Sequence, residues 1–583
     1  MKRFLKPIAV FLMTWSMTIA SGINSVNFLT VIFLMCSMGL INLLDKVLTE
    51  KEKKPGRSLW LFSVMMSFLF AGGAAKNWTE AFDNKLFKVV IVAIAVVGLI
   101  CIIFCSINIL YAFIDNLSTF LRDRYEKENE AEVKCSFLLK HTIIFAMAVC
   151  FIAWLPYFLY LFPGVMTPDS INQLEQAMGM TNYSNHHPWI HTLLIKYTFL
   201  PGRFISGTNN GGVACYTIVQ MLLCSFTAGF AVDTIKKIKM PKVVLIIVLV
   251  FFAIVPFNAV YVVTMWKDVI FGYSVLALNC ILVRLLLLKD KKMTVPLGLV
   301  GVIICLFRSN GWYGFILATI VLSILLIKKK NIIPIIPILA GTIVISGIVR
   351  GPIMKACNVV QPDFVESISV PLQQVARVIV EGKDLSEEEM DLIAGVMDVT
   401  YVEQLYDETF ADNIKELVRA GNPEYLTEHK GEYLKLYIKL GIRYPQVYLA
   451  AYNGQVGGYW YPDSQQNIAD TEGICPNDCG VYSAPVIGGK ILLKAKEIWI
   501  KLGNTIPIYG LIWCTGSVVW LVVISAFYLW ERKRRDRLVI YLPSFCILLT
   551  VLIATPVSGD FRYIYYLVLS LPLFFASLLK TND

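Results

Sequence analysis

The sequence predicts an all-α polytopic membrane protein, and three observations carry that prediction. The chain has 583 residues, of which 57% are hydrophobic and only 16% are charged, and its mean hydropathy is +0.64. The apolar residues gather in long runs, as expected of helices that satisfy their backbone hydrogen bonds inside a bilayer. Basic clusters recur between those runs, as they do in multi-pass proteins. Together these features exclude a soluble globular enzyme.

About fourteen apolar runs are predicted to be transmembrane helices. The first follows the basic segment MKRFLK, and no small-residue cleavage site follows it, so we interpret it as a retained anchor and not as a signal peptide. The predicted spans are 7–22, 27–47, 58–75, 86–110, 138–162, 211–235, 242–262, 267–288, 293–308, 312–328, 331–350, 504–530, 538–555 and 561–579.

The basic connections between the runs predict the orientation of the chain. They fall at 51–57, 121–129, 236–242, 289–292, 328–330 and 531–537. If the chain has fourteen spans and both termini are cytoplasmic, all of these connections lie on the cytoplasmic side. The net charge of +10 then reflects basic loops that face anionic lipid, and not binding to nucleic acid. We expect a multi-pass protein of a bacterial plasma membrane.

Under this topology, two long stretches lie outside the cell, at 163–210 and 351–503. Only the second is long enough to fold as a soluble domain, which we expect to be mainly α-helical. The chain then divides into an N-terminal four-helix membrane module, a membrane core, the external domain and a C-terminal three-helix part of the core. Their ranges are 1–134, 135–350, 351–503 and 504–583.

The external domain contains two patterns with structural meaning. The sequence SEEE at 386–389 is typical of a capping box and predicts the start of a helix. The run 432–452 has apolar residues at helical spacing, and we expect it to rest on the membrane as one amphipathic helix. It would hold a loop at 459–463 whose exposed aromatic side chains either stack on a sugar acceptor or sit among lipid headgroups. Those side chains are Tyr459, Trp460 and Tyr461.

Most of the fourteen cysteines fall inside predicted spans, where cysteine packs as a small apolar residue. Cys475 and Cys479, in the sequence CPNDC, are predicted to lie outside the cell, and they are candidates for a disulfide. A metal site there needs two further ligands that the neighbouring sequence does not supply. No cofactor is indicated, although a divalent metal elsewhere stays open.

The polar loop at 163–191 stands out because it holds three of the five histidines of the chain beside an apolar run. It also carries Asp169, and a carboxylate at a membrane edge can act as a general base. The alternative is a plain loop in which Asp169 is the N-cap of an ordinary helix. The following segment, 188–204, would rise only about 24 Å as a helix, so we interpret it as an interfacial helix and not as a span.

Charged and polar residues mark the external ends of three later spans. A single one of them is explained by a snorkelling side chain or an interfacial ion pair. However, a charge at bilayer depth costs about 2.5–3.5 kcal/mol, so such residues tend to face a polar cavity. Cations gathered around Asp169 describe a pocket that holds a phosphate with a base beside it. The charged and polar residues at these three span ends are Lys267, Asp268, Arg308, Asn310, Asp560 and Arg562.

Four short motifs together resemble the GT-C class of integral-membrane glycosyltransferases, over about 135–583. They are MTPDS, NHHP, WKD and RSNG, and they are similar to those of a bacterial branch of the protein mannosyltransferase and aminoarabinose transferase superfamily. The resemblance implies a GT-C-like core with an interfacial helix at 188–204. It implies a catalytic Asp169 and basic residues that bind the donor phosphate, at Lys267, Arg308 and Arg562. Those branches usually carry paired acidic residues where this chain has Asp169-Ser170.

The function expected from these features is transfer of a sugar from a polyprenyl-phosphate donor to an envelope glycan, lipid or protein acceptor. Asp169 would deprotonate the acceptor hydroxyl and His187 would orient a substrate, with Asp268, Asn310 and Asp560 in support. No nucleotide sugar is expected, because no Gly-rich phosphate loop is present. Two alternatives stay open. One is a flippase or other transporter of lipid-linked sugars, and the other is a polymerase or ligase of lipid-linked glycans.

Overall fold

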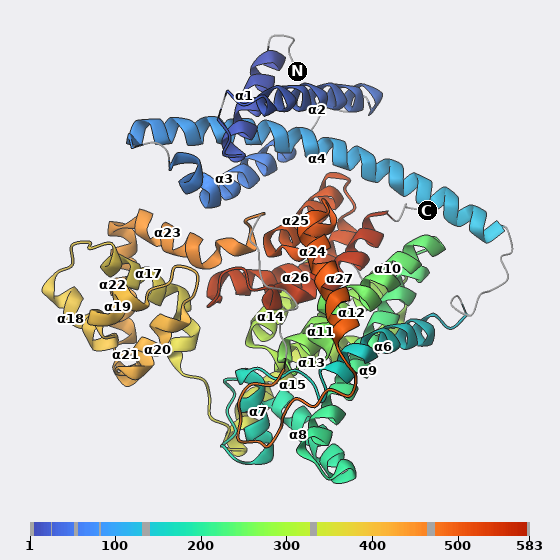
Figure 1. Cartoon of the computed structure of the whole chain (residues 1–583), viewed down its shortest axis with the longest axis vertical. Helices are drawn as coiled ribbons and strands as arrows, with labels where there is room; N and C mark the ends of the chain where they lie inside the picture. The colour runs from blue at the N-terminus through green and yellow to red at the C-terminus, as the bar shows by residue number, and fades with distance from the viewer. Residues whose placement is uncertain are drawn as a thin grey trace.

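The computed structural model describes residues 5–24, 26–51, 56–80, 83–130, 140–326, 335–462 and 473–579. Within these ranges every regular element is a helix, and extended segments meet only in isolated β-bridges. Figure 1 shows three groups of elements: the N-terminal helices at one end, a compact helical domain at one side, and a large helical core that ends in α7 and α8. The predicted all-α membrane fold is confirmed at this level.

The N-terminal helices are α1 (Leu5–Ala20), α2 (Leu29–Lys51), α3 (Arg57–Thr79) and α4 (Lys85–Glu130). Helix α4 has 46 residues and runs well past the predicted span 86–110, through the basic segment expected to be a connection. It does so because this stretch contains no proline to interrupt the helix. The second half of α4 is held to the C-terminal helices: Asp115 pairs with Arg532 at 2.7 Å.

The core contains α6, α9 to α15 and α25 to α27, and the central helix is α12. Helix α12 is buried along nearly its whole length, and α9, α13, α26 and α27 surround it. The bounds of the core helices are Thr142–Tyr160 (α6), Asn209–Lys237 (α9), Lys242–Ile254 (α10), Pro256–Val262 (α11), Lys267–Leu286 (α12), Thr294–Phe307 (α13), Ser309–Leu326 (α14), Ile335–Ile348 (α15), Thr515–Glu531 (α25), Arg535–Ala554 (α26) and Phe561–Leu579 (α27).

Nine helices in the described part of the chain are long and apolar enough to cross a membrane. A tenth span results if α10 and α11, which are bent by 51° at Val255, are counted as one. Proline at position 256 explains the break, because it forces the preceding residue out of the helical region. Helices α1, α14 and α25 are apolar but shorter. Each of the fourteen predicted spans overlaps an observed helix, but crossing by all fourteen remains a prediction.

Contacts near the end of α12 opposite to Lys267 join two of the basic connections, 121–129 and 236–242. Near this end Arg284 pairs with Asp233 at 2.9 Å. The Lys242 amide donates to Glu128 at 3.0 Å, which brings the end of α4 to the start of α10. The two ends of a 20-residue helix are separated by about 30 Å, which is the thickness of the hydrocarbon core.

A separate apolar core lies between α17 (Ser369–Val380) and α23 (Pro445–Val456). The predicted capping box is confirmed: Ser386 and Glu389 cap α18 (Glu387–Val396) reciprocally. The single helix predicted at 432–452 is wrong. The chain breaks at Tyr444 between α22 (Lys430–Arg443) and α23, because proline at 445 has no N–H and disfavours a helical residue before it. We call 364–456 the α17–α23 domain.

Two further boundaries differ from the prediction. Helix α8 (Trp189–Ser206) continues through Pro201 and Gly202, and ends at Gly207, whose φ of 69° suits glycine. It is not among the helices apolar enough to cross a membrane, and it exposes Phe204 and Ile205. The predicted span 504–530 is interrupted, because α24 (Lys490–Thr505) ends before a short 3-10 turn and α25 begins only at Thr515.

Candidate functional site

Three distant segments of the chain build the backbone of the predicted site. The amide of Val165 donates to the Val263 carbonyl, and the amide of Met265 donates back to the Val165 carbonyl, each at 2.9 Å. On the other side, the Cys475 amide donates to the Met166 carbonyl at 2.9 Å. These bonds lock the loop before Asp169 between the end of α11 and the segment that follows the α17–α23 domain.

Asp169 occupies the second position of α7 (Pro168–Met178), so the alternative interpretation of Asp169 as the N-cap is wrong. Thr167 is the N-cap, and it forms a capping box with Ser170. Thr167 Oγ1 also accepts a hydrogen bond of 2.8 Å from Trp266 Nε1. Because Thr167 and Ser170 cap the helix, the Asp169 carboxylate is free to face outward, and its side chain is 41% exposed.

Two basic side chains from other elements approach the Asp169 carboxylate. Arg562 Nη1, from α27, lies 3.8 Å from Asp169 Oδ2. His187 Nε2, from the loop before α8, lies 4.0 Å from Asp169 Oδ1. Both distances are longer than a hydrogen bond, so the carboxylate is oriented by opposite charge and dipole without being closed off. An exposed carboxylate in this position can accept a proton from a bound hydroxyl group.

The proton of His187 is placed by Lys267. Lys267 Nζ lies 2.9 Å from His187 Nδ1, and an ammonium group can only donate, so Nδ1 accepts. The ring proton is therefore on Nε2, the atom that faces Asp169. Burial, and after it the positive charge of Lys267, lower the pKa of His187 to about 2. His187 is thus a neutral hydrogen-bond donor at physiological pH.

Lys267 differs from the other two predicted phosphate-binding residues, Arg308 and Arg562, in its ion pairing. Arg308 pairs with Asp268 at 2.8 Å, and both side chains are almost fully buried. Arg562 pairs with Asp560 at 2.9 Å. Lys267 forms no ion pair with any carboxylate in the described part of the chain, and its polar partner is the neutral His187. A half-buried ammonium group beside a neutral imidazole is suited to bind an anion.

Aromatic rings cover the two arginines. Arg562 lies 4.9 Å from the centre of the Trp266 ring, and Arg308 lies 4.5 Å from that of Tyr563. Arg308 is the single residue between α13 and α14, as expected of a tight re-entry. Asn310 lies inside α14 and has no described side-chain contact with these residues. We call the seven residues brought together here the Asp169 cluster: Asp169, His187, Lys267, Asp268, Arg308, Asp560 and Arg562.

A buried hydrogen-bond chain behind the cluster was not recognised in the sequence. His191 Nδ1 lies 2.8 Å from Gln173 Oε1, and His191 Nε2 lies 2.6 Å from the hydroxyl of Tyr216. The Tyr216 hydroxyl donates to Gln220, whose amide donates to the carbonyls of Val262 and Thr264. These hydrogen bonds therefore connect α7 and α8 to the segment that precedes Lys267. One signal was available: Gln220 is a polar residue within an apolar run.

The aromatic residues expected on an exposed acceptor loop are packed inside the protein, so that expectation is wrong for two of them. Tyr459 is fully buried, and its hydroxyl lies 3.1 Å from Thr555 Oγ1. Trp460 is 8% exposed. Tyr461 is only half-buried. Glycines at 457 and 458 let the backbone approach its neighbours closely, which draws the aromatic residues inward. Residue 463 lies outside the described residues.

The predicted disulfide is also wrong: Cys475 and Cys479 are free thiols. The turn between them is closed by Asn477, whose side chain accepts from the Cys479 amide at 3.1 Å and donates to the Val481 carbonyl at 2.9 Å. Cys479 packs into the apolar cluster beneath α7. In the described part of the chain, no group of three or more His, Cys, Asp or Glu side chains is arranged to hold a metal ion.

Comparison with known proteins identifies a family and nothing more specific. No curated protein matches the chain, and no solved structure matches it. One family matches residues 13–582, which is nearly the whole chain, from the first helix through the C-terminal α27. The match therefore includes every residue of the Asp169 cluster. The chain belongs to the family of unknown function DUF6020.

Proposed function

We propose that the protein transfers a sugar from a polyprenyl-phosphate donor to a hydroxyl group of an envelope acceptor, with Asp169 as the general base. One observation carries the proposal. An exposed carboxylate, Asp169, and a half-buried cation, Lys267, lie at opposite nitrogens of the His187 ring, and Lys267 has no carboxylate partner in the described residues. The carboxylate suits an acceptor hydroxyl, and the cation suits the phosphate of a donor.

In the proposed reaction, the acceptor hydroxyl gives its proton to Asp169 as its oxygen attacks the anomeric carbon. The bond from that carbon to the phosphate oxygen breaks, and its electron pair leaves with the polyprenyl phosphate. The configuration at the anomeric carbon is inverted because attack and departure occur on opposite faces of the sugar. Lys267 stabilises the phosphate charge that develops. His187 orients Asp169 through its Nε2 proton, and the charge of Arg562 attracts the same carboxylate at 3.8 Å.

The architecture fits a GT-C enzyme of the bacterial plasma membrane, which is the class that the motifs resemble. In this proposal, α8 is the interfacial helix after the catalytic loop. Its exposed Phe204 and Ile205 then insert among lipid headgroups and acyl chains. The Asp169 cluster faces outward, and the basic connections at the other end of α12 face the cytoplasm. All fourteen predicted spans take part in crossing the membrane, those with shorter helices by lying tilted or partly enclosed.

A second candidate function is movement of a lipid-linked sugar across the membrane. The bend of 51° between α10 and α11 favours it, because broken helices are typical of transporter binding sites. We rank it second because the bend leads directly into 262–266, the segment that positions Lys267, so it has a role in the Asp169 cluster. A polymerase or ligase of lipid-linked glycans shares the same chemistry and differs from our proposal only in the product.

The proposal is tested on the lipids of a strain that lacks the gene. We expect a polyprenyl-phosphate sugar to accumulate and to disappear when the wild-type gene is restored. In a strain that carries Asp169→Asn, the lipid should still accumulate. The variant protein should nevertheless reach the wild-type level and thermal stability, because the exposed carboxylate makes no contact shorter than 3.8 Å. Glu175→Gln, on the same helix, is the matched control, and in a strain that carries it the lipid should disappear as with the wild-type gene. Restoration by Asp169→Asn would refute the role of Asp169.

The two candidate functions differ in reconstituted vesicles. The lipid that accumulates in the deletion strain is extracted and incorporated into vesicles with the purified protein. A transferase consumes it when an acceptor is added and leaves its distribution between the leaflets unchanged. Equilibration of the lipid between the leaflets without any product would establish the transporter instead.

A further inference from the structure

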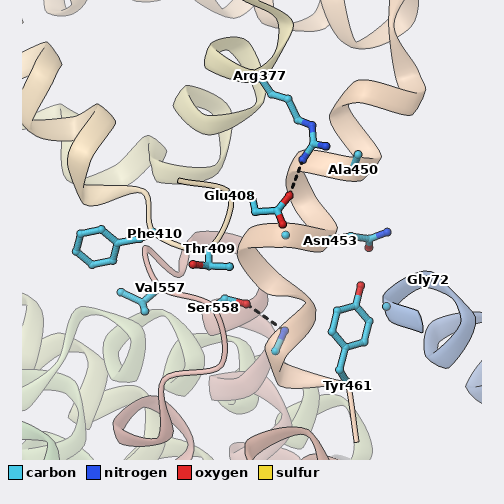
Figure 2. Close-up of a pocket in the computed structure, with 13 residues that line it drawn as sticks. Gly72, Arg377, Glu408, Thr409, Phe410, Ala450, Asn453, Tyr461, Val557 and Ser558 are labelled. Atoms are coloured by element: carbon cyan, nitrogen blue, oxygen red, sulfur yellow. Dashed lines mark hydrogen bonds and ion pairs between the residues drawn. The ribbon is translucent and has the colours of Figure 1, made fainter. Parts of the chain in front are cut away.

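A pocket lies apart from the Asp169 cluster, between α3, α17, the loop 408–410, α23 and the segment that precedes α27. Its volume is about 630 Å³, within the range of about 300–1,000 Å³ of small-molecule sites. Its walls come from five parts of the chain, and Figure 2 labels residues from each of them. Thirteen residues line it: Gly72, Gly73, Arg377, Glu408, Thr409, Phe410, Ala450, Asn453, Gly454, Gly458, Tyr461, Val557 and Ser558.

The charges in this pocket cancel. Arg377 and Glu408 are the two charged residues that line it, and they lie 3.4 Å apart. Arg377 is held on its other side by Glu381, at 2.9 Å. A guanidinium group between two carboxylates has little attraction left for a phosphate or a carboxylate ligand. The pocket therefore favours a ligand that has no net charge.

The remaining polar groups suit a ligand rich in hydroxyl groups. The Asn453 amide offers both donors and an acceptor, and it makes no hydrogen bond to another described residue. The exposed part of the Glu408 carboxylate accepts hydrogen bonds, and Thr409 adds a hydroxyl group. An amide and a carboxylate that line one pocket match the hydroxyls of a sugar, each of which donates and accepts.

An aromatic ring is fixed at the edge of the pocket. A Cβ atom added to Gly73 would lie 2.2 Å from the Tyr461 ring, and one added to Gly457 would lie 2.3 Å from it. The ring is therefore clamped between two glycines, one from α3 and one from the turn after α23. In Figure 2, the hydroxyl of Tyr461 points in the direction of Asn453. A rigid ring beside polar groups gives an apolar face for the C–H side of a sugar at small entropic cost.

We propose that this pocket binds a neutral glycan segment, and that helix α3 of the N-terminal module completes the site. The segment 555–560 connects it with the first site, since Ser558 lines the pocket and Asp560 belongs to the Asp169 cluster. The use of this glycan as part of the acceptor rests on the proposed function, whereas the binding itself does not. The N-terminal helices thereby gain a role that their sequence did not indicate.

Binding is measured by saturation-transfer NMR on the full-length protein in detergent. The probes are cellobiose and the disaccharide of N-acetylglucosamine as neutral glycans, with galacturonic acid and glycerol 3-phosphate as anions. We expect a neutral disaccharide to bind and the two anions not to bind. The proposal would be overturned if saturation were transferred only to the anions, only to the detergent, or to none of the four probes.

Two variants locate the binding. A Cβ atom at Gly72 meets only Asn453 Nδ2, at 3.6 Å, so Gly72→Leu directs a side chain into the pocket from a Cβ atom that does not clash. We expect it to abolish disaccharide binding. Asn453→Leu should weaken binding about tenfold, as expected for the loss of about 1.4 kcal/mol of hydrogen bonding. Gly39→Leu, in α2, where a Cβ atom meets nothing within 4 Å, is the matched control and should bind normally.

The readouts separate this inference from the proposed transferase. If Asp169→Asn binds the disaccharide but transfers nothing, both stand. If the deletion strain accumulates no donor but the disaccharide binds in a manner sensitive to Gly72→Leu, the pocket stands and the transferase fails. Disaccharide binding that is unchanged by both Gly72→Leu and Asn453→Leu would place the ligand elsewhere and refute the pocket.

Discussion

Lys267 Nζ donates a hydrogen bond of 2.9 Å to His187 Nδ1, and this contact determines which nitrogen of the imidazole carries the proton. Nε2 then faces Asp169 Oδ1 at 4.0 Å. A residue at the start of α12 thereby sets the hydrogen-bonding character of a residue in the loop before α8, and through it the orientation of the carboxylate on α7. The three residues are far apart in sequence but act as one unit in the proposed site.

The role of Lys267 as the phosphate-binding cation is testable by direct binding. Lys267→Met should weaken binding of decaprenyl phosphate by about ten- to a hundredfold, because a hydrogen bond to a charged group contributes about 1.5–3 kcal/mol. The measurement is microscale thermophoresis of the protein in nanodiscs. Arg203→Met, on the exposed end of α8, is the control for general attraction between basic residues and phosphate. Equal losses in the two variants would remove Lys267 from the site.

The buried pair of Arg308 and Asp268 should contribute mainly to stability. Arg308→Gln and Asp268→Asn should each destabilise the protein by about 3–5 kcal/mol, because each leaves one buried charge without its partner. The double variant should lose much less than the sum, and the difference is obtained from a double-mutant cycle of thermal unfolding. If instead Arg308→Gln keeps wild-type stability and loses only phosphate binding, Arg308 is a donor ligand and the pair is incidental.

Two neutral histidines predict a loss of stability in acid. Burial is the main cause that lowers the pKa of His187 to about 2 and that of His191 to about 3. Between pH 6.5 and about 3 the unfolded chain binds protons at these residues that the folded chain does not, so stability falls as the pH falls. The slope is about 1.4 kcal/mol per pH unit for each histidine.

The histidine contribution is isolated by comparing variants. The melting temperature is measured from pH 8 to pH 5 for the wild type, His187→Gln and His191→Gln. Each variant should show a shallower decline than the wild type. A parallel decline for all three proteins would mean that both site histidines take up protons freely when folded.

Adjacent glycines in α3 should respond in opposite ways to the same substitution. Gly73→Ala places a methyl group 2.2 Å from the Tyr461 ring, which the glycine at 457 prevents from moving away. We expect a loss of about 1–3 kcal/mol, typical of overpacking. Gly72→Ala finds ordinary contact at 3.6 Å and should be neutral or stabilising by up to about 1 kcal/mol. Thermal unfolding of the two variants checks the pair, and similar melting temperatures would contradict the clamp.

The local sequence determined most of the secondary structure and the membrane class. Runs of apolar residues predict helices because a segment in a bilayer must pair its own backbone groups, whatever its neighbours are. The same applies to the capping box at Ser386 and Glu389, which closes within one helical turn. The polar loop around Asp169 was also recognisable, because an accumulation of charged and histidine residues beside an apolar run is a property of the chain alone.

Features that depend on contacts between distant segments were predicted incompletely or wrongly. Tyr459 and Trp460 were expected on an exposed loop, but the glycines before them allow close packing against residues 555–559. The pairing of Arg308 with Asp268, which leaves Lys267 as the cation without a carboxylate partner among the described residues, arises from three helices that only the fold brings together. Composition shows that charges lie near a membrane edge. Which of them neutralise one another depends on distances of a few ångströms, because the Coulomb energy and the cost of burying a charge change steeply over that range.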